Sequence, residues 1–421
     1  MSTMTQPSEH DDKTEARPRI DRSVKRLIGG IVPANMAIFA VWGAVTGILL
    51  PLQIEGIDPA NKVANLAIVT SIGALAAMIA QPVAGMLSDR TRSRFGRRAP
   101  FIVGGALIGG LALVGMAVGN TLVHIAIAWI IVQVAYNFAQ GPLSAILPDR
   151  IPRAVRGTFS AMAGLGVMLG AFGGQVLGAS LAEAIPTAYL LLAGIALVVL
   201  TLFVVLNPDR SSTDLVPARF SLRGFLRTFW VNPVAHPDFA WAFAGRLLLY
   251  TGYFVAVGYQ LYILQDYIGL GDSAAAMIPM FGLISMAGLL IATVVSGPLS
   301  DRIGRRKVFV FASSALVGIA MLVPLFMPTV GGWILFSVIS ALGFGMFQAV
   351  DTALISEVLP SDESFAKDLG VVNIAGTLPQ TVAPAVAGLI ILVGGYAALF
   401  PIGLALAVLG ALAVAPIKSV R

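Results

Sequence analysis

Long apolar runs separated by short polar segments dominate the pattern of the chain. Apolar stretches of 20 or more residues recur from about residue 29 to about residue 416, and each can cross a hydrocarbon core of about 30 Å as a helix. The runs are continuously apolar and do not alternate with period two, which favours membrane helices over a β-barrel. The pattern predicts twelve helices, over residues 29–53, 63–87, 99–118, 121–147, 158–181, 186–206, 238–263, 274–299, 308–328, 332–359, 369–393 and 395–416.

The composition agrees with an all-α membrane protein. Hydrophobic residues make up 57% of the 421 residues and charged residues only 11%, and the mean hydropathy is +0.88. Such a chain has too little polar surface to coat a soluble globule. The 45 glycines and 24 prolines are frequent inside the predicted spans, where close packing between membrane helices tolerates them.

The positive charges predict the orientation of the bundle. Of the 27 lysines and arginines, all except Lys62 and Arg246 lie in the two tails or in loops on one side of the predicted helices. Cytoplasmic loops of membrane proteins carry such an excess, so we expect a multi-pass protein of the cytoplasmic membrane with both termini in the cytoplasm. The net charge of +6 then follows from topology and contact with anionic lipid, and we expect no nucleic-acid partner.

The sequence lacks the residue patterns that several kinds of catalytic and metal-binding sites require. There is no cysteine, and the three histidines, His10, His124 and His236, lie far apart in the sequence. No nucleophile, metal-ligand or phosphate-binding pattern occurs, so we expect no enzymatic activity, no metal and no cofactor. A receptor or scaffold would have a large soluble domain, whereas the longest polar stretches are a tail and a linker of about 30 residues each.

Two internal correspondences indicate a duplication. Residues 85–98 read GMLSDRTRSRFGRR and residues 297–306 read GPLSDRIGRR, with four extra residues in the first copy. An independent set at the ends of the fourth and tenth runs shares its relative spacing: Gln140, Ala145, Asp149 and Pro152 with Gln348, Ala353, Glu357 and Pro360. Two halves of six helices are the parallel repeat of a transporter that works by rocking motion.

The expected domain organisation follows from this repeat. A cytoplasmic tail covers residues 1–28, an N-terminal six-helix bundle residues 29–206 and a cytoplasmic linker residues 207–237. A C-terminal six-helix bundle covers residues 238–416, and residues 417–421 form a cytoplasmic C-terminus.

The repeated loop of Gly, Asp-Arg and Gly-Arg-Arg resembles the signature loop of the major facilitator superfamily over essentially the whole membrane region. Residues 81–102, QPVAGMLSDRTRSRFGRRAPFI, resemble more narrowly the sucrose-type and glycoside–pentoside–hexuronide:cation symporters, together with Asn137, Gln140, Gly141, Pro142, Ala145 and Asp149. The resemblance implies the major facilitator fold, with twelve transmembrane helices in two pseudo-symmetric six-helix halves. It also implies alternating access, with helices 1, 4, 7 and 10 lining a central cavity.

The charged loops are interpreted as a conformational latch. Asp89 ends the second helix, where it can accept hydrogen bonds from arginines or from an adjacent helix N-terminus, and Gly85 permits close helix packing. A purely topological role would need the arginines alone. The expected latch residues are Gly85, Asp89, Arg90, Gly96, Arg97, Arg98, Asp149, Gly297, Asp301, Arg302, Arg305 and Glu357.

Two charges lie deep in predicted membrane helices. Arg246 and Asp351 each stand about eight residues above the cytoplasmic ends of the seventh and tenth helices, and their equal depth suggests a pair. Charge at this depth is costly and usually functional. Burial favours the protonated carboxyl and a guanidinium favours the carboxylate, so we expect Asp351 and Arg246 to couple transport to protons. A permanent structural ion pair is the alternative.

Polar side chains form stripes on the same helices. Amides hydrogen-bond hydroxyls and aromatic faces stack on sugar rings, which suits a neutral polyol. Each residue could instead bridge two helices. The candidate solute-binding residues are Asn35, Trp42, Gln133, Tyr136, Asn137, Gln140, Arg246, Tyr250, Tyr253, Gln260, Gln348 and Asn373.

The sequence differs from related transporter families at positions that matter for their solute binding and ion coupling. Sucrose-type transporters carry an arginine where this chain has Ser144, and the aspartates of sodium-coupled melibiose permeases have no acidic counterpart in residues 63–87. The glycines of the fifth helix resemble a drug–proton antiporter motif, but Ala171 replaces its proline, so we interpret them as close packing.

We therefore expect a secondary transporter that imports a sugar or glycoside by proton symport. The alternatives are a uniporter of the same solutes and a proton-coupled efflux antiporter of drugs or metabolites. The expected partners are a small solute, protons and membrane lipid, and the expected state is a monomer.

Overall fold

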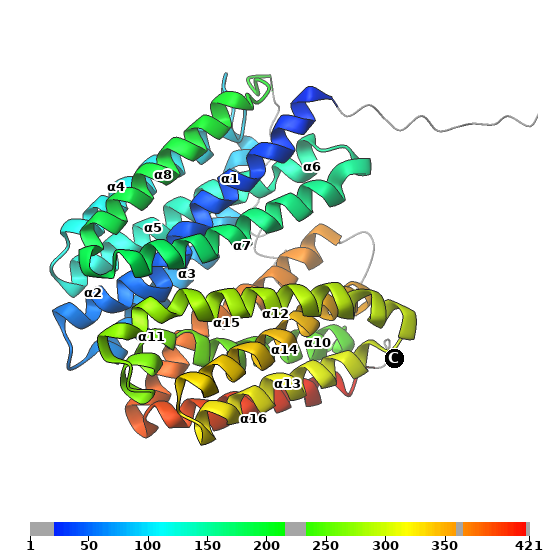
Figure 1. Ribbon diagram of the computed structural model, residues 1–421. Helices are drawn as coiled ribbons and strands as arrows, with labels where there is room; N and C mark the ends of the chain where they lie inside the picture. The colour runs from blue at the N-terminus through cyan, green and yellow to red at the C-terminus, as the bar shows by residue number, and fades with distance from the viewer. Residues whose placement is uncertain (1–20, 215–232, 359–364, 418–421) are drawn as a thin grey trace, which may run out of the picture.

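The structure is a computed structural model that describes residues 21–214, 233–358 and 365–417. These residues form helices and no strands, arranged as two bundles side by side (Figure 1). Twelve helices in the described residues are long and apolar enough to cross a membrane. The predictions of twelve spans and of an all-α membrane protein are confirmed, and the observed spans differ from the predicted ones mainly by a few residues at their ends.

The N-terminal half comprises elements α1 to α8. Its bounds are α1 (Arg22–Ala44), the π-helical turn η1 (Val45–Leu49), α2 (Leu50–Ile57), α3 (Lys62–Arg90), α4 (Ala99–Val118), α5 (Leu122–Ser144), α6 (Ile146–Arg150), η2 (Arg153–Val155), α7 (Arg156–Ser180), η3 (Ala182–Ala184) and α8 (Ile185–Leu206). The elements α1, η1 and α2 together form the first membrane span, and α5 with α6 forms the fourth.

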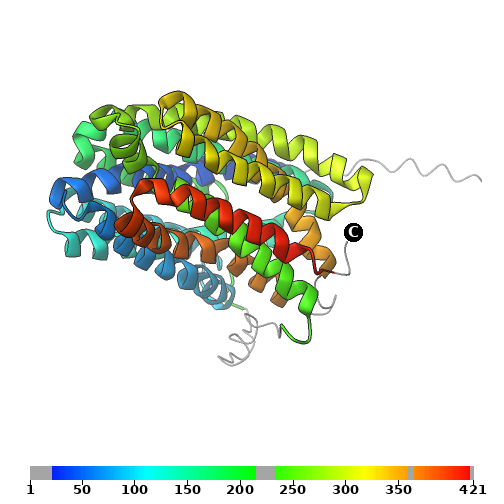
Figure 2. The same cartoon turned by 90° about the horizontal axis from the view of Figure 1, so that it is seen from below.

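The C-terminal half comprises elements α10 to α16. Its bounds are α10 (Pro237–Val257), α11 (Gln260–Tyr262), the π-helical turn η4 (Ile263–Tyr267), η5 (Gly271–Ser273), α12 (Ala274–Ile303), α13 (Arg306–Phe326), α14 (Val330–Val358), α15 (Phe365–Gly394), η7 (Tyr396–Ala398) and α16 (Leu399–Val414). Figure 2 views the molecule from the side of this half, with α16 in red beside its neighbours.

The packing repeats from one half to the other, as a duplicated chain requires. In the N-terminal half α1 packs on α7 and α8, while α5 packs on α3 and α4, and α4 on α8. The same pairs recur in the C-terminal half, where α10 packs on α15 and α16, α14 on α12 and α13, and α13 on α16. The halves themselves meet where α3 contacts α15 and where α7 contacts α12.

Glycines bring α7 close to α1. A Cβ atom on Gly166, Gly170 or Gly174 would overlap the backbone of α1, whereas one on Gly157 or Gly173 would contact nothing within 4 Å. Small residues on one helix allow backbones to approach in this way. Three of the glycines that resemble an antiporter motif therefore serve the packing within the N-terminal half.

The seventh membrane helix is shorter than predicted. The prediction of a helix over residues 238–263 is wrong at its end. The helix α10 stops at Val257, and Gly258 and Tyr259 form a turn before α11 begins at Gln260. The break turns Tyr259 inward, where its hydroxyl donates to the carbonyls of Val63 (3.2 Å) and Pro384 (3.1 Å). At this turn, Tyr259 is thus bonded to both halves of the molecule.

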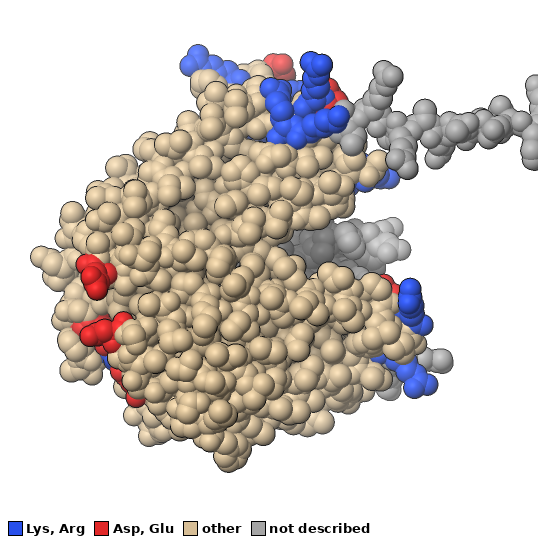
Figure 3. Space-filling model, viewed as in Figure 1, with Lys and Arg blue, Asp and Glu red and all other residues tan. Residues whose placement is uncertain are grey.

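The two ends of the bundle carry different charged residues. Figure 3 shows lysines and arginines at one end, hereafter the basic end, and acidic side chains at the opposite end, the acidic end. Both described chain ends lie at the basic end (Figure 1). The surface is hollowed between the halves at the basic end, whereas the halves meet at the acidic end (Figure 3).

Candidate functional site

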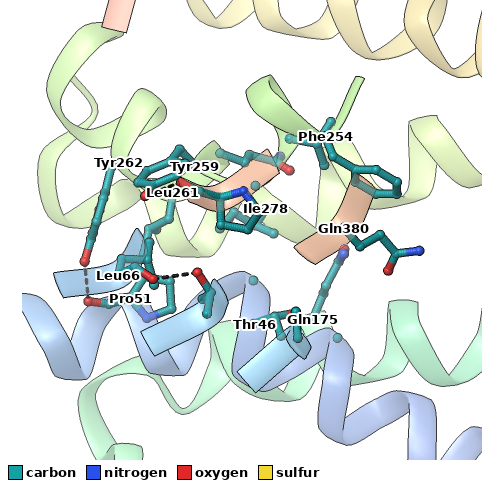
Figure 4. A pocket seen from close by; sticks show the side chains of 18 of the residues that line it. Thr46, Pro51, Leu66, Gln175, Phe254, Tyr259, Leu261, Tyr262, Ile278 and Gln380 are labelled. Atoms are coloured by element: carbon teal, nitrogen blue, oxygen red, sulfur yellow. Dashed lines mark hydrogen bonds between the residues drawn. The ribbon is translucent and has the colours of Figure 1, made fainter. Parts of the chain in front are cut away.

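A central cavity lies between the two halves. Its volume is about 290 Å³, and the wall comes from η1, α3, α5 and α7 of one half and from α10, α11, α12 and α15 of the other. Figure 4 shows these side chains converging from both halves. Its polar wall residues are Thr46, Thr70, Trp129, Gln133, Gln175, Tyr259, Gln260, Tyr262 and Gln380. Among the described residues that line it, none is an ionisable acid or base apart from the tyrosine hydroxyls, and such a wall suits an uncharged polar solute.

Tyrosines close the cavity towards the acidic end. The Tyr262 hydroxyl donates to the Pro51 carbonyl at 2.8 Å across the two halves, and this bond is drawn in Figure 4. The Tyr259 hydroxyl joins Val63 of α3 to Pro384 of α15. These contacts leave the cavity shut at the acidic end.

An ionic cluster reinforces this closure. The Lys62 ammonium lies 2.7 Å from Glu55 Oε1 and 2.9 Å from Asp266 Oδ2. The Gln265 amide donates to Glu55 (3.1 Å), and the Tyr396 hydroxyl donates to Asp266 (2.6 Å). Glu55 and Lys62 belong to the N-terminal half and the other three residues to the C-terminal half, so the cluster joins the halves. We call these five residues the acidic-end clamp.

Local hydrogen bonds hold the loop that presents Lys62. The side chains of Asn61 and Asn65 donate to the Asp58 carboxylate, and these bonds lower the pKa of Asp58. Asp58 therefore stays ionised and orders the turn between α2 and α3. The clamp was not predicted from the sequence, although Lys62 is the one basic residue in the predicted loops on its side of the membrane.

The candidate residues of α1 and α5 mostly bridge these helices. Trp42 Nε1 donates to Gln133 Oε1 at 2.9 Å, and Gln140 Nε2 donates to Asn35 Oδ1 at 3.2 Å. The Asn137 amide donates to the Gln133 carbonyl of its own helix. Of these five residues, Gln133 contributes to the wall of the central cavity.

Tyr136 does not line the cavity. Its side chain is fully buried, and its ring lies against Gly109 of α4. Tyr136 stands three residues after Gln133, at the edge of the stripe formed by Gln133, Asn137 and Gln140, so the helical rotation turns it towards the interior of the N-terminal half. The wall of the central cavity therefore gives no support to Tyr136 as a solute-binding residue.

The candidates of the C-terminal half divide into two groups. Gln260 lines the cavity. It belongs to α11 and not to α10, which carries Arg246, Tyr250 and Tyr253. Tyr253 stacks on Phe344 with ring centroids 4.2 Å apart, and Tyr250 packs edge-on against the same ring at 5.0 Å. These tyrosines form an aromatic cluster between α10 and α14.

The last two solute-binding candidates are Gln348 and Asn373. Gln348 is exposed on α14. The side chain of Asn373 lies outside the described residues, as does that of the latch candidate Glu357.

Arg246 and Asp351 form an ion pair inside the C-terminal half. Arg246 Nη1 lies 3.1 Å from Asp351 Oδ2, and both side chains are largely buried. The guanidinium also lies over the ring of Tyr250, 5.2 Å from its centroid, and packs against Gly376 of α15. Arg246 precedes Phe254 of the cavity wall by two helical turns, about 12 Å, so the pair lies on the basic-end side of the cavity.

The first charged loop folds into a compact ionic cluster. Arg98 lies 2.6 Å from Asp89 and 2.8 Å from Asp149, and Arg97 lies 2.8 Å from the second oxygen of Asp149. Arg98 also donates to Ser88 and is buried. All partners belong to the N-terminal half, so the contacts fasten α3, α4 and α6 to one another. Arg90 ends α3 beside this cluster.

The glycines of the two charged loops differ in what they contribute. Gly96 and Gly304 have φ angles of 85° and 67°, a left-handed conformation that favours glycine. A side chain on Gly85 or Gly297 would contact nothing within 4 Å, so the helix packing around Gly85 does not require a glycine at this position in the structure.

The second charged loop is looser than the first. Asp301, Arg302 and Arg305 are exposed, and Arg306 Nη2 lies 3.9 Å from Asp301 Oδ1. The two copies of one sequence motif therefore differ in the described part of the structure.

The start of the linker is bound to the first charged loop, which the sequence did not predict. Ser212 N donates to the Ser93 carbonyl and Ser93 N donates to Ser212 Oγ, each at 3.0 Å. Arg150 donates to the carbonyl of Asn207, and Asp209 occupies the space beside Gly96. We call residues 207–214 the linker strap.

Comparisons with known proteins agree with this architecture. The sequence profile of the family described as "MFS/sugar transport protein" matches residues 60–415. The sucrose transport protein SUC4 of Arabidopsis thaliana is 30% identical over 190 residues, which cover 40% of this chain and 36% of that protein. An uncharacterized MFS-type transporter of Mycobacterium tuberculosis H37Rv, Rv2456c, is 25% identical over 80% of each chain.

Solved structures share the fold. The nucleoside transporter NupG superposes with a TM-score of 0.74 over 94% of this chain and 100% of its own, at 15% identity. A bacterial homolog of the human lysosomal transporter Spinster, in an inward-facing and unoccupied conformation, has a TM-score of 0.72 over 94% and 96% of the two chains, at 13% identity. Together with the match over most of the membrane region, these findings show that the chain belongs to the MFS/sugar transport family of the major facilitator superfamily.

Proposed function

We propose that the protein imports a neutral sugar or glycoside by proton symport. One observation carries the proposal: a cavity whose described wall residues include no charged side chain lies two helical turns from the buried Arg246–Asp351 ion pair. A neutral solute and a proton would thus have separate sites in the same transport path. The family match and the sucrose-transporter relative support the sugar class.

Asp351 is the proposed proton site. A buried carboxylate can hold either a proton or an ionic partner, because desolvation disfavours its charge and a guanidinium restores it. Arg246 comes from the neighbouring helix α10, so a shift between α10 and α14 would exchange the partner for a proton.

The proposed orientation places the basic end in the cytoplasm. The excess of lysine and arginine at that end supports it, and both termini would then be cytoplasmic in a protein of the cytoplasmic membrane. With the acidic end closed and the basic end hollowed (Figure 3), the described state is inward-open. The halves around residues 29–206 and 238–416 would rock about the central cavity, and one chain supplies the whole site, so a monomer suffices.

Transport in proteoliposomes tests the proposal. The panel contains labelled sucrose, glucose, uridine and tetraphenylphosphonium, with and without an imposed proton gradient. We expect counterflow of a sugar without a gradient and its accumulation with one. Transport of the cation without any sugar would contradict the proposal and favour the efflux antiporter.

A further inference from the structure

A groove lies between α4 and α5 on the surface that faces the membrane. Its volume is about 410 Å³, and its described wall residues belong to these two helices and are all apolar. Ile108 of α4 and Ile131 of α5 both line it, and they are 53% and 40% exposed. The groove therefore opens towards lipid and not towards the interior of the bundle.

Two adjacent glycines of α4 shape the groove. A Cβ atom on Gly105 would overlap the Ala135 carbonyl of α5, so this glycine allows the two backbones to approach closely. A Cβ atom on Gly104 would contact nothing within 4 Å, and this space is part of the hollow. Phe101 and Phe138 stack on each other in the wall, with ring centroids 6.3 Å apart. Small residues thus leave a hollow between larger apolar side chains.

The groove runs from the basic end towards the middle of the membrane. Its wall begins at Pro100, the second residue of α4, and reaches Ile108 on the same helix. Eight residues of helix cover about 12 Å, and the hydrocarbon layer of one leaflet is about 15 Å thick. The length of the groove therefore matches one acyl chain of the leaflet whose headgroups contact the basic end.

The loop that leads into α4 carries cations at the same end. Arg92 and Arg94 are exposed, and neither belongs to the ionic cluster that holds Arg97 and Arg98. The Arg94 guanidinium lies over the ring of Phe95, 4.6 Å from its centroid, and this ring is 60% exposed. Arginines at the level of the lipid headgroups attract anionic lipids.

We propose that the groove between α4 and α5 binds one acyl chain of an anionic phospholipid, whose headgroup contacts Arg92 and Arg94. An acyl chain would gain dispersion contacts with the apolar walls, and a zwitterionic lipid has the same chains without the net negative charge. A second copy of this chain would bring an equally basic loop to the same place, so the charge favours lipid. The inference needs neither a transported solute nor a proton and does not rest on the proposed function.

Photo-crosslinking in nanodiscs tests the inference. A trace of phosphatidylglycerol with a diazirine in one acyl chain is added to the full-length protein in phosphatidylcholine nanodiscs, and labelled peptides are mapped by mass spectrometry. We expect the label on the groove segments of α4 and α5. The fraction of unlabelled phosphatidylglycerol that halves the labelling gives its affinity relative to phosphatidylcholine. Arg94→Gln should lower this relative affinity about fivefold, whereas Arg305→Gln, an exposed arginine of the second charged loop, should leave it unchanged.

Gly104→Leu tests the groove itself. The new side chain enters open space and takes the volume of about two methylene groups of the lipid, so labelling should fall about tenfold. Gly194→Leu on α8 is the matched control, because Gly194 is exposed and a Cβ there also contacts nothing within 4 Å. This control should be labelled like the wild type.

Several results would overturn the inference. They are labelling spread evenly over the membrane-facing helices, equal competition by the two phospholipids, and wild-type labelling in folded Gly104→Leu. Displacement of the probe by cholesterol alone would assign the groove to a sterol, and particles that hold two chains with unlabelled grooves would assign it to a second copy. Arg94→Gln changes only an exposed loop side chain, so the headgroup contact is tested even where Gly104→Leu does not fold.

Discussion

Lys62 Nζ lies 2.9 Å from Asp266 Oδ2, and this ion pair joins the two halves at the acidic end although the residues are 204 positions apart in the chain. Lys62 also binds Glu55 of its own half. A state that is hollowed at the basic end needs contacts that hold the opposite end shut. The acidic-end clamp supplies them, and it must separate before the cavity can open in the other direction.

Removing the clamp should shift the protein towards the outward-open state. For Lys62→Met we expect a three- to tenfold faster reaction of a single cysteine, introduced as Thr46→Cys, with an impermeant maleimide added from the acidic end. A partly exposed ion pair contributes about 1 kcal/mol, which changes a two-state ratio about fivefold. The natural chain has no cysteine, so the label reports this site alone.

Glu183→Gln is the matched control for the clamp. Glu183 is an exposed acid of η3 outside the clamp, and its loss should leave the labelling rate unchanged. An unchanged rate in Lys62→Met as well would show that the clamp does not hold this state.

The Arg246–Asp351 pair gives a second prediction. If Asp351 carries the proton, Asp351→Asn should abolish accumulation driven by a pH gradient and preserve counterflow, because exchange requires no net release of protons. Both activities are measured at matched protein level, with Asp272→Asn, an exposed acid of η5, as the control.

A structural pair would behave differently. Removing one partner would leave a buried charge, which costs about 3 kcal/mol, and the double variant Asp351→Asn with Arg246→Gln would regain much of the lost Tm. Intact pH-driven accumulation in folded Asp351→Asn would remove this residue as the coupling site.

The two acids of the first charged loop should differ in importance. Asp149 binds Arg97 and Arg98, whereas Asp89 binds Arg98 and is more than half exposed. We expect Asp149→Asn to destabilise the protein by about 2 to 3 kcal/mol, because it leaves the buried Arg98 with its weaker partner. Asp89→Asn should lower the maximal rate more than the affinity, since it leaves the cavity intact.

Thermal unfolding and counterflow kinetics of both variants check this ranking. Equal losses of Tm, or a weakened affinity with an unchanged maximal rate in Asp89→Asn, would contradict the roles assigned to these acids.

Gly96→Ala should loosen the linker strap. Gly96 has a φ of 85°, and a methyl group there would also overlap Asp209. We expect a loss of about 1 to 2 kcal/mol from the backbone conformation alone. Limited proteolysis should cut within residues 207–214 faster than in the wild type.

Gly104→Ala on α4 is the control for the strap, because a Cβ there contacts nothing within 4 Å. A strap that is cut at the wild-type rate in Gly96→Ala would mean that its bonds to Ser93 and Arg150 hold it without the contact at Gly96.

The number and position of the membrane helices follow from the sequence because each depends on local composition. About 20 apolar residues are needed to cross the hydrocarbon core, so each span can be recognised without knowledge of its neighbours. The deep charges of Arg246 and Asp351 were visible for the same reason, since any charge in such a run stands out.

Relations between elements were decided by the tertiary structure. Helical periodicity places Tyr136 near the face of α5 that carries Gln133. In the structure the Tyr136 ring instead packs against Gly109 of α4, inside the N-terminal half. At the break after Val257, the Tyr259 hydroxyl donates to two carbonyl acceptors from different halves. A local pattern contains no information about such distant partners.

The closed end depends on how the halves sit together. Lys62 contacts Asp266, and Gln175 lies beside Gly282, across the boundary between the two bundles. A transporter must hold two arrangements of nearly equal free energy, and the same sequence encodes both. The helices and their charges are therefore determined along the chain, whereas the contacts of the site are properties of one arrangement of the halves.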